Sequence, residues 1–349
     1  MNLTLHSPEA DHRPRTQPGI TRRKIIQISA VAGFLGAAWY FGVKPRSSLK
    51  TVRYSQPLMG TMLNMTVCGP HEEECRTAIQ DCIARMAQLS SMMSTYEPDS
   101  PLSVLNRTGM VLKAPPELLE VFRMARELSE LTNGAFDPTI KPLLGLYKEV
   151  KTSGILPPED KIKEILHLVD YRHIVVKDLA VSLSHQGVEV TLDGIAKGYI
   201  VDQGVAVLRN LGFTDAYVEA GGDLMTIGHR SDGERWRIGI RNPRSDDLKA
   251  MDTIELSNRA IATSGDYLQY FTDDKTTHHI INPQTGFSPV ETASSSILAP
   301  TVAKADGLAT ATMVLGPTKA VDLVESLPEC EGYFIDKHLN KYQTTGFFS

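Results

Sequence analysis

Apolar residues recur every three or four positions along several stretches of the chain, and this spacing predicts amphipathic helices. The clearest stretch is 72–93, where Ile79, Ile83 and Met86 mark one face. Elsewhere, alternating apolar and polar residues predict half-buried strands. Further helices are expected at 115–131, from Pro138 onward, at 159–166, at 195–208 and at 306–314. Strands are expected within 51–67 and at 174–176, 180–184, 188–192, 216–218, 224–227, 236–241, 253–256, 260–263 and 267–271.

The order of these elements indicates an α+β fold. Many strands follow one another on short connections, and the helices are grouped rather than alternating with strands, which disfavours a doubly wound α/β sheet. A loop is expected at 94–101, and Asn133-Gly134 should end the helix that precedes it. The chain has no internal repeat and no Gly-x-Gly-x-x-Gly, so a Rossmann site has no support.

One apolar run near the N-terminus differs from the rest. It spans 25–43 and follows Arg22-Arg23-Lys24, and a basic region before an apolar stretch is typical of an export signal or a membrane anchor. Its length is near the roughly 20 residues needed to span a bilayer, so both a cleaved signal and a retained anchor fit. Thr21-Arg22-Arg23 also resembles a twin-arginine signal. The bias of basic residues places the rest of the chain on the periplasmic side of a bacterial inner membrane.

These features divide the chain into four parts. They are a disordered basic region (1–24), the signal or transmembrane segment (25–43), a linker (44–50) and one folded domain (51–349). The net charge of −5 argues against nucleic acid as the main partner. There is no Cys-x-x-Cys motif, and Cys75 and Cys82 lie about 10 Å apart along one predicted helix, too far to bridge within it. Free buried thiols are therefore expected, although export would permit disulfides.

Residues 188–202 carry the first candidate chemistry. A predicted strand runs through Asp193-Gly194 into a predicted helix, with Asp193 where an N-cap belongs. The N-terminus of a helix offers unpaired N–H groups and is a ready anion site, and Lys197 would add a positive charge. Gly198 weakens the helix by about 1 kcal/mol relative to alanine, which suggests a close approach there. An ordinary capped helix with a tolerated glycine explains the same residues.

Asp306 and Thr310 lie four residues apart on the predicted C-terminal helix, so they point the same way. A carboxylate and a hydroxyl are hard oxygen ligands that suit Mg²⁺ and not zinc. Mg²⁺ commonly takes its remaining ligands from water and substrate phosphates. The alternative from spacing alone is a buried aspartate beside a threonine that bonds back to a helix carbonyl.

Further segments follow along the chain. After 193–198 come Ala220-Gly221-Gly222-Asp223, then Ala-Thr-Ser-Gly-Asp-Tyr at 262–267, His-His-Ile-Ile-Asn-Pro-Gln-Thr-Gly at 278–286 and Ala-Asp-Gly-Leu-Ala-Thr-Ala at 305–311. Together and in this order, over roughly residues 54 to 346, they resemble the ApbE family, the FAD:protein FMN transferases. The resemblance implies an ApbE-like flavin transferase domain over 51–349, with T-fold-related mixed sheets packed with helices.

The resemblance also implies where the ligands lie. The carbonyl of Ala196 would join Asp306 and Thr310 around Mg²⁺. The implied flavin-binding residues are Met59, Tyr96, Ala135, Phe136, Asp137, Asp193, Lys197, Tyr199, Gly221, Gly222 and Ile280. Several have simpler alternatives: Tyr96 as a loop aromatic folded back on the core, Asp137 as a plain N-cap, and Gly221-Gly222 as a tight turn.

The family's histidine directly precedes an isoleucine, which selects His279 rather than His278. If both lie at a strand end, their side chains face opposite ways. The turn that follows departs from the family, which usually has Asp-Pro and Arg where this chain has Asn282-Pro283 and Gln284. That departure removes the charges which the family carries in this turn.

The reaction implied is Mg²⁺-dependent transfer of FMN from FAD to a Ser or Thr hydroxyl of an electron-transfer flavoprotein, with release of AMP. A base must take the hydroxyl proton, and the candidates are His279, Asp266 and the carboxylates near the metal. Lys197 and the helix N-terminus would stabilise phosphate oxygens. Two alternatives remain at this point: hydrolysis of FAD to FMN and AMP, and a periplasmic flavin-binding or assembly protein without turnover.

Overall fold

The computed structural model describes residues 49–245 and 249–349, without the side chains of residues 151 and 152. The predicted disordered region (1–24), signal or transmembrane segment (25–43) and most of the linker (44–50) lie outside the described residues. Strand β1 (Lys50–Leu58) is the first described element. Within the two described ranges, no helix is both long and apolar enough to cross a membrane.

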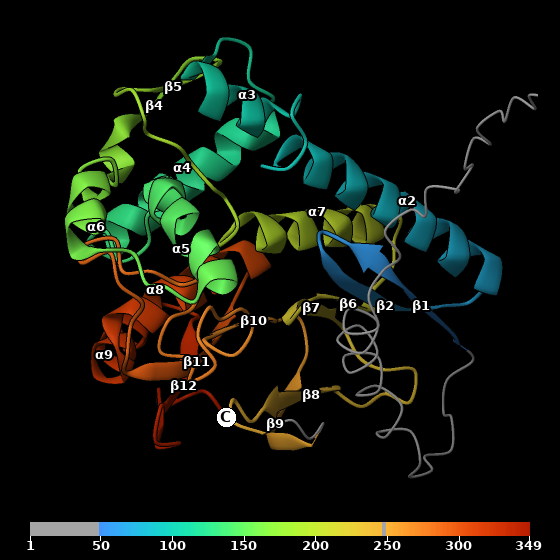
Figure 1. Cartoon of the computed structure of the whole chain (residues 1–349). Coiled ribbons are helices and arrows are strands. Elements are labelled where there is room, and N and C mark those ends of the chain that lie inside the picture. Colours follow the sequence, from blue (N-terminus) through green and yellow to red (C-terminus); the bar gives the residue numbers. More distant parts are fainter. Residues whose placement is uncertain (1–48, 246–248) are drawn as a thin grey trace, which may run out of the picture. The chain divides into compact units, whose positions relative to one another are not determined.

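An antiparallel sheet organises the described part of the chain, where its eight strands have the order β1-β2-β6-β7-β10-β11-β12-β13 (Figure 1). After β1 these strands are β2 (Thr61–Gly69), β6 (Asp215–Ala220), β7 (Asp223–Ile227), β10 (Ala260–Gly265), β11 (Thr292–Ala299), β12 (Glu331–Asp336) and β13 (Lys341–Gln343). Smaller sheets join β3 (Met110–Val111), β5 (Ala180–Leu183) and β4 (Ile174–Lys177), and β8 (Trp236–Arg241) with β9 (Ala250–Leu256).

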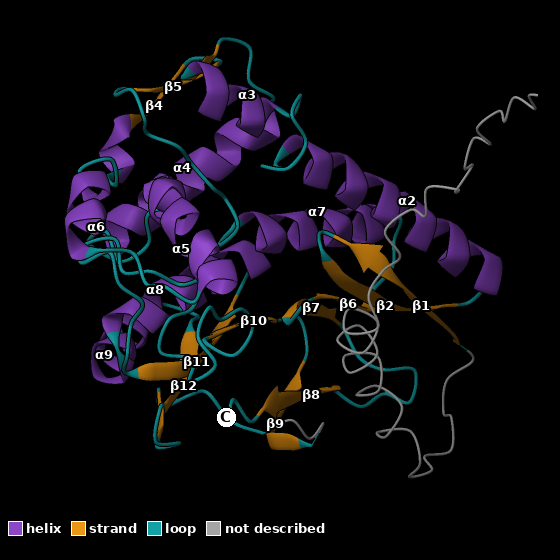
Figure 2. Ribbon diagram, in the orientation of Figure 1, coloured by secondary structure: helices purple, strands orange, loops and turns teal. Residues whose placement is uncertain are grey.

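The central strands are covered on both faces, which explains why every residue of β7 and β11 is buried. Helices α2 (Glu72–Met92), α7 (Ala196–Asn210) and α8 (Val302–Leu315) share the larger apolar core with strands β2 and β6 (Figure 2). The β8–β9 pair packs through Ile240 and Ile254 on residues of β7, β10 and β11, such as Leu224. The other helices of the described residues are α3 (Pro101–Thr108), α4 (Pro116–Leu131), α5 (Lys141–Ser153), α6 (Glu159–Leu166), α9 (Pro317–Glu325) and the short η3 (Pro138–Ile140) and η4 (Tyr171–His173).

Most predicted elements are confirmed, and the fold is of the α+β class. Helix α2 ends one residue short of its predicted end, and it buries Cys75 and Cys82 on one face. All four cysteines are buried and free. Helix α4 ends before Asn133 and Gly134, both of which have positive φ. The sequence prediction did not include the helices α3 and α9 or the strands β3, β11, β12 and β13.

Two predicted strands are wrong: a distant side chain in one case and local turn hydrogen bonds in the other take the place of the ladders they would need. Residues 188–192 belong to no strand ladder in the described chain, and Asn106 takes the place of a partner strand: its side chain accepts from the Val190 N–H at 2.7 Å and donates to the Val190 carbonyl at 2.8 Å. Residues 267–271 form turns with a single isolated bridge between Tyr270 and His278.

Candidate active site

The start of α7 is the centre of the candidate site. The helix begins at Ala196, and the amides of Ile195 and Ala196 both donate to the carbonyl of Leu192, at 3.0 and 2.7 Å. Asp193 is therefore not the N-cap, and its side chain is exposed in the turn before the helix. The prediction of an N-cap was wrong because a backbone turn, rather than a carboxylate, satisfies these amides. The Asp193 carboxylate is left available to a ligand.

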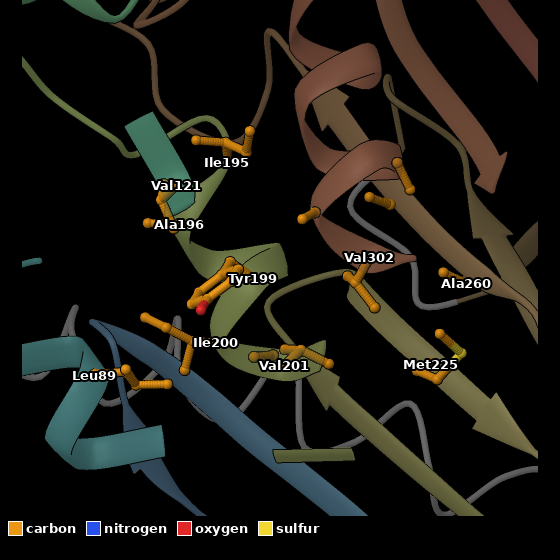
Figure 3. Packing of buried hydrophobic residues seen from close by; sticks show 14 of the residues in the cluster. Leu89, Val121, Ile195, Ala196, Tyr199, Ile200, Val201, Met225, Ala260 and Val302 are labelled. Carbon is orange, nitrogen blue, oxygen red and sulfur yellow. The ribbon is translucent and has the colours of Figure 1, made fainter. Parts of the chain in front are cut away.

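Asp306 approaches this helix start from α8. Its Oδ2 accepts from the Gly198 N–H at 3.1 Å, and only 4% of the residue is exposed. The backbones are close, since a Cβ on Gly198 would lie 2.5 Å from the Val302 carbonyl oxygen. Figure 3 shows Val302 of α8 beside the part of α7 that carries Tyr199 and Val201. The predicted close approach at Gly198 is thus confirmed, and the partner is α8. Burial raises the pKa of Asp306, which Lys197 and the Gly198 amide oppose.

Thr310 lies one helical turn beyond Asp306 and faces the same region. A Cβ on Gly194 would be 3.1 Å from the Thr310 Oγ1, and the Ser264 hydroxyl lies 3.4 Å from it. Residues 194–198, which include Ala196, therefore contact both Asp306 and Thr310. A backbone carbonyl, a carboxylate and a hydroxyl are hard oxygen donors that fit Mg²⁺. The described residues contain no group of three His, Cys, Asp or Glu side chains that could hold a metal, so any site here depends on such mixed donors.

Lys197 is held by a carboxylate that the sequence reasoning missed. Its Nζ pairs with the Asp223 Oδ2, and the Asp223 side chain is almost fully buried. Beside it, the buried Glu219 accepts from the Asn64 side chain at 2.6 Å and from the Gly222 N–H at 2.7 Å. The sequence held one signal for this arrangement: an acidic residue directly after the Gly-Gly turn between β6 and β7.

The Gly221-Gly222 turn has φ values of +64° and +101°, a conformation that favours glycine. The tight turn that the sequence offered as the simpler explanation is confirmed. Met59 occupies a comparable place in the β1–β2 turn, where it has a φ of +53° and is half-buried. Non-glycine residues seldom adopt this conformation, so the position is worth testing as a ligand contact.

His279 lies in a loop rather than at the end of a strand. Its ring Nδ1 is 2.9 Å from the Gln269 carbonyl oxygen, which also accepts from the His279 backbone N–H. Because a carbonyl can only accept, Nδ1 carries the proton and Nε2 keeps its lone pair. Burial lowers the pKa of His279, and the charge of Lys197 adds to this effect. The ring is therefore neutral near pH 7, with Nε2 able to accept a proton.

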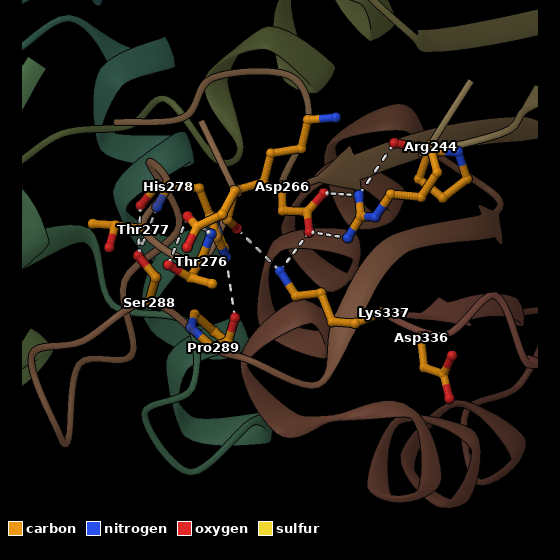
Figure 4. A network of polar contacts seen from close by, with 12 residues as sticks. Arg244, Asp266, Thr276, Thr277, His278, Ser288, Pro289, Asp336 and Lys337 are labelled. Atoms are coloured by element: carbon orange, nitrogen blue, oxygen red, sulfur yellow. Dashed lines mark hydrogen bonds and ion pairs between the residues drawn. The ribbon is translucent and has the colours of Figure 1, made fainter. Parts of the chain in front are cut away.

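His278 has a different role. It is fully buried, its Nε2 lies 3.1 Å from the Pro289 carbonyl, and burial lowers its pKa to about 4. Figure 4 shows it beside Ser288, whose hydroxyl donates to the His278 carbonyl at 2.8 Å and accepts from its N–H at 2.9 Å. These contacts make His278 a structural residue, as the preference for His279 implied.

Asp266 was a candidate base, and its surroundings argue against that role. Its carboxylate receives Arg244 Nη1 and Nη2 at 2.8 and 2.7 Å and also pairs with Lys337 (Figure 4). Burial favours the neutral acid, but the hydrogen bonds from the two cations outweigh it, so the pKa of Asp266 is lowered. An acid with a lowered pKa and two cationic partners is a poor proton acceptor. Asp266 instead connects three loops.

Of the other residues implied for flavin binding, Tyr96 is exposed, whereas Phe136, Asp137 and Tyr199 are buried. Tyr96 is 79% exposed, so the alternative that it folds back on the core is wrong. Phe136 is buried, with its ring edge 3.1 Å from where a Cβ on Gly194 would be. Asp137 caps η3 by accepting from the Thr139 N–H at 2.8 Å, which confirms the N-cap interpretation. Tyr199 is buried and donates to Glu120 at 2.6 Å.

The family assignment rests on a comparison that spans all of these residues. A model of the ApbE family matches residues 59–334, which is more than half of the chain and reaches from Met59 past Thr310. The chain belongs to the ApbE family. Ala135 and Ile280, both buried, also lie within the matched range. So do Asp223 and Glu219.

Two curated relatives of this ApbE-family chain share one name. The FAD:protein FMN transferase of Vibrio cholerae is 32% identical over 283 residues, covering 79% of this chain and 84% of the relative. The protein of the same name from Haemophilus influenzae is 33% identical over 291 residues, covering 79% and 84%. Among solved structures, the ApbE protein of Thermotoga maritima aligns with a TM-score of 0.78 at 28% identity, covering 86% of this chain and 100% of that one. The flavin transferase ApbE of Vibrio cholerae aligns at 0.73 and 29%, covering 86% and 98%.

Proposed function

We propose that this ApbE-family enzyme transfers FMN from FAD to a Ser or Thr hydroxyl of a partner flavoprotein and releases AMP. The names of its relatives support the transfer of a flavin to protein. The observation that carries the chemistry is that Asp306 and Thr310 bring a carboxylate and a hydroxyl to the start of α7. His279 supplies a neutral ring, held through Nδ1 by the Gln269 carbonyl, whose Nε2 can accept a proton.

Each step of the reaction is assigned to a residue of the chain. His279 Nε2 accepts the proton of the attacking hydroxyl, and its Nδ1–H to the Gln269 carbonyl keeps the ring oriented. The hydroxyl oxygen bonds to the FMN phosphorus as the bond from that phosphorus to the oxygen of the AMP phosphate breaks. Lys197, oriented by Asp223, neutralises charge on the phosphate oxygens. The product is a phosphoester-linked flavin on the acceptor, plus AMP.

Asp306, Thr310 and the carbonyl of Ala196 would hold Mg²⁺ at the pyrophosphate. A bound Mg²⁺ supplies charge neutralisation on the bridging phosphate oxygens. The raised pKa of Asp306 fits this role, because a buried carboxylate held beside a single amide gains most when a cation is present.

Exposed Tyr96 and buried Phe136 are the aromatic groups proposed to contact the flavin, with Met59, Ala135, Asp193 and Ile280 around them. The export signal or anchor expected at 25–43 leads us to place the reaction on the periplasmic side of a bacterial inner membrane. The acceptor would then be an exported or membrane-bound electron-transfer protein carrying a Ser/Thr flavinylation motif.

The test combines the full chain with FAD, Mg²⁺ and an acceptor domain that carries such a motif. Intact mass of the acceptor and AMP release are followed together. We expect one FMN added per acceptor and one AMP released, with both lost on addition of a chelator and in Asp306→Ala. AMP without acceptor modification would overturn the transferase in favour of FAD hydrolysis. Bound FAD with neither product would overturn catalysis altogether.

A further inference from the structure

The start of α7 and helix α8 meet at three contacts, and successive contacts lie four residues apart along both segments. Gly194, Gly198 and Asp202 follow one another on the α7 side, and Thr310, Asp306 and Val302 face them in reverse order. Residues four apart on a helix share a face, so these contacts form one antiparallel interface. The two predicted metal ligands of α8, Thr310 and Asp306, make two of these three contacts. The third contact, between Asp202 and Val302, has no role in the proposed reaction.

At the third contact, Asp202 of α7 caps the N-terminus of α8. The first turn of a helix has amides without intrahelical partners. The Asp202 Oδ1 accepts from the Val302 N–H at 2.8 Å, and its Oδ2 accepts from the Ala303 N–H at 2.9 Å. The helix's own N-cap, Thr301, serves the next amide, that of Lys304, at 3.3 Å. A side chain of α7 therefore satisfies two first-turn amides of α8.

A carboxylate is suited to this position for two reasons. Its two oxygens match two amides, and its charge complements the positive end of the α8 dipole. Burial raises the pKa of Asp202 to about 6, against the effect of the two amides, so the group is ionised at pH 7.5. One helical turn away, Gly198 also brings the two backbones into close contact.

We propose that Asp202 is a positioning residue: by holding the N-terminus of α8 on α7, it sets the register that places Asp306 and Thr310 at the start of α7. This inference rests on the proposed function, because it assigns Asp202 a task for the proposed metal site. It differs from a merely structural role in one respect. Loss of the Asp202 link should affect the metal site more than loss of an equivalent cap that does not cross to α7.

Thr301 provides that matched control, since Thr301→Ala removes a cap from the same helix end but leaves the link to α7 intact. Binding of Mn²⁺ as a spin probe is measured by EPR on the full chain with FAD at pH 7.5, without acceptor. Asp202→Asn keeps the size of the side chain but cannot accept from both amides, and Asp202→Ala removes both bonds. We expect the Mn²⁺ dissociation constant to rise about tenfold in both, as for other groups that orient metal ligands, and to stay within twofold in Thr301→Ala.

The outcomes distinguish a failure of the positioning role of Asp202 from a failure of the metal site itself. Unchanged Mn²⁺ affinity in both folded Asp202 variants, or an equal loss in Thr301→Ala, would overturn the positioning role. If Asp202→Ala does not fold, Asp202→Glu keeps the charge at a changed length and should still weaken Mn²⁺ several-fold. Asp306→Ala tests the metal site itself in the same assay. Mn²⁺ binding that Asp306→Ala does not alter would overturn that site and, with it, this inference.

Discussion

His278 and His279 are adjacent, but their rings differ in what they can do. The Nδ1–H of His279 is held by the Gln269 carbonyl, which leaves Nε2 as a proton acceptor, while His278 is enclosed by Ser288 and Pro289. We therefore expect His279→Gln to lower kcat for flavin transfer by about 10²–10⁴-fold while FAD still binds. Stopped assays of acceptor flavinylation measure the rate, and flavin fluorescence measures binding.

His229 offers the control, because it is exposed in the loop after β7 and is not among the proposed catalytic or binding residues. His229→Gln should keep the wild-type rate. The pH profile adds a second readout. Because burial lowers the pKa of His279, the base is neutral at pH 7, and kcat/KM should fall only below about pH 6.5. A wild-type rate in His279→Gln would exclude His279 as the base.

Helices α7 and α8 leave no room for a side chain at Gly198. A Cβ at Gly198 would lie 2.5 Å from the Val302 carbonyl oxygen and 2.8 Å from the Ala303 Cα, both backbone atoms that cannot rotate away. Gly198→Ala should therefore separate α7 from α8, lowering the melting temperature and weakening Mn²⁺ binding despite the better helix propensity of alanine. Thermal unfolding and Mn²⁺ titration measure the two effects.

Gly145 is the matched control for this prediction. It lies in α5, it is exposed, and a Cβ there would meet nothing within 4 Å. Gly145→Ala should stabilise the protein by up to about 1 kcal/mol, because alanine favours the helix and nothing opposes it. A Gly198→Ala protein as stable as Gly145→Ala would show that the helices do not need this close contact.

The sequence predicted most elements whose cause is local, with α3 as an exception, and misjudged those whose cause is distant. Helix α2 could be found because its apolar face repeats along one segment, and the end of α4 because Asn133-Gly134 supplies the positive φ itself. Residues 188–192 alternate like a strand, yet their partner is the side chain of Asn106, about 80 positions away. Helix α3 was missed although Ser100 caps it and Pro101 opens it, two local signals that were read as part of the loop.

The residues of the candidate site also differ in whether the sequence could identify them. The resemblance selected Asp306, Thr310 and His279, and the structure brings the helix start and α8 together as that set requires. The Lys197–Asp223 pair and the Asp202 link remained hidden, because each joins elements that only the folded chain brings together. The partners of Asp266 that argue against a role as base were hidden in the same way, since Arg244 and Lys337 lie 22 and 71 residues away.

The whole molecule should respond to acid through its buried histidine. The pKa of His278 is about 4 in the fold against 6.5 for a free side chain, because burial disfavours its charged form. Lys337 and His279 add to this lowering, and the Pro289 carbonyl and Asp266 oppose it. Between these two pH values the unfolded chain binds more protons than the fold, so stability falls as pH falls from 6.5 to 4. The full effect of this one group is about 3 kcal/mol.

Denaturant unfolding of wild type and His278→Gln at several pH values measures this effect, with the slope against pH as the readout rather than the stability at any one pH. Asp202 acts in the opposite direction, since its raised pKa of about 6 makes the fold lose stability as pH rises from 3.8. It is present in both proteins, so the difference between them isolates His278. The wild type should lose more stability than His278→Gln on going from pH 6.5 to 4, and equal slopes would mean that His278 is protonated as readily in the fold as in the unfolded chain.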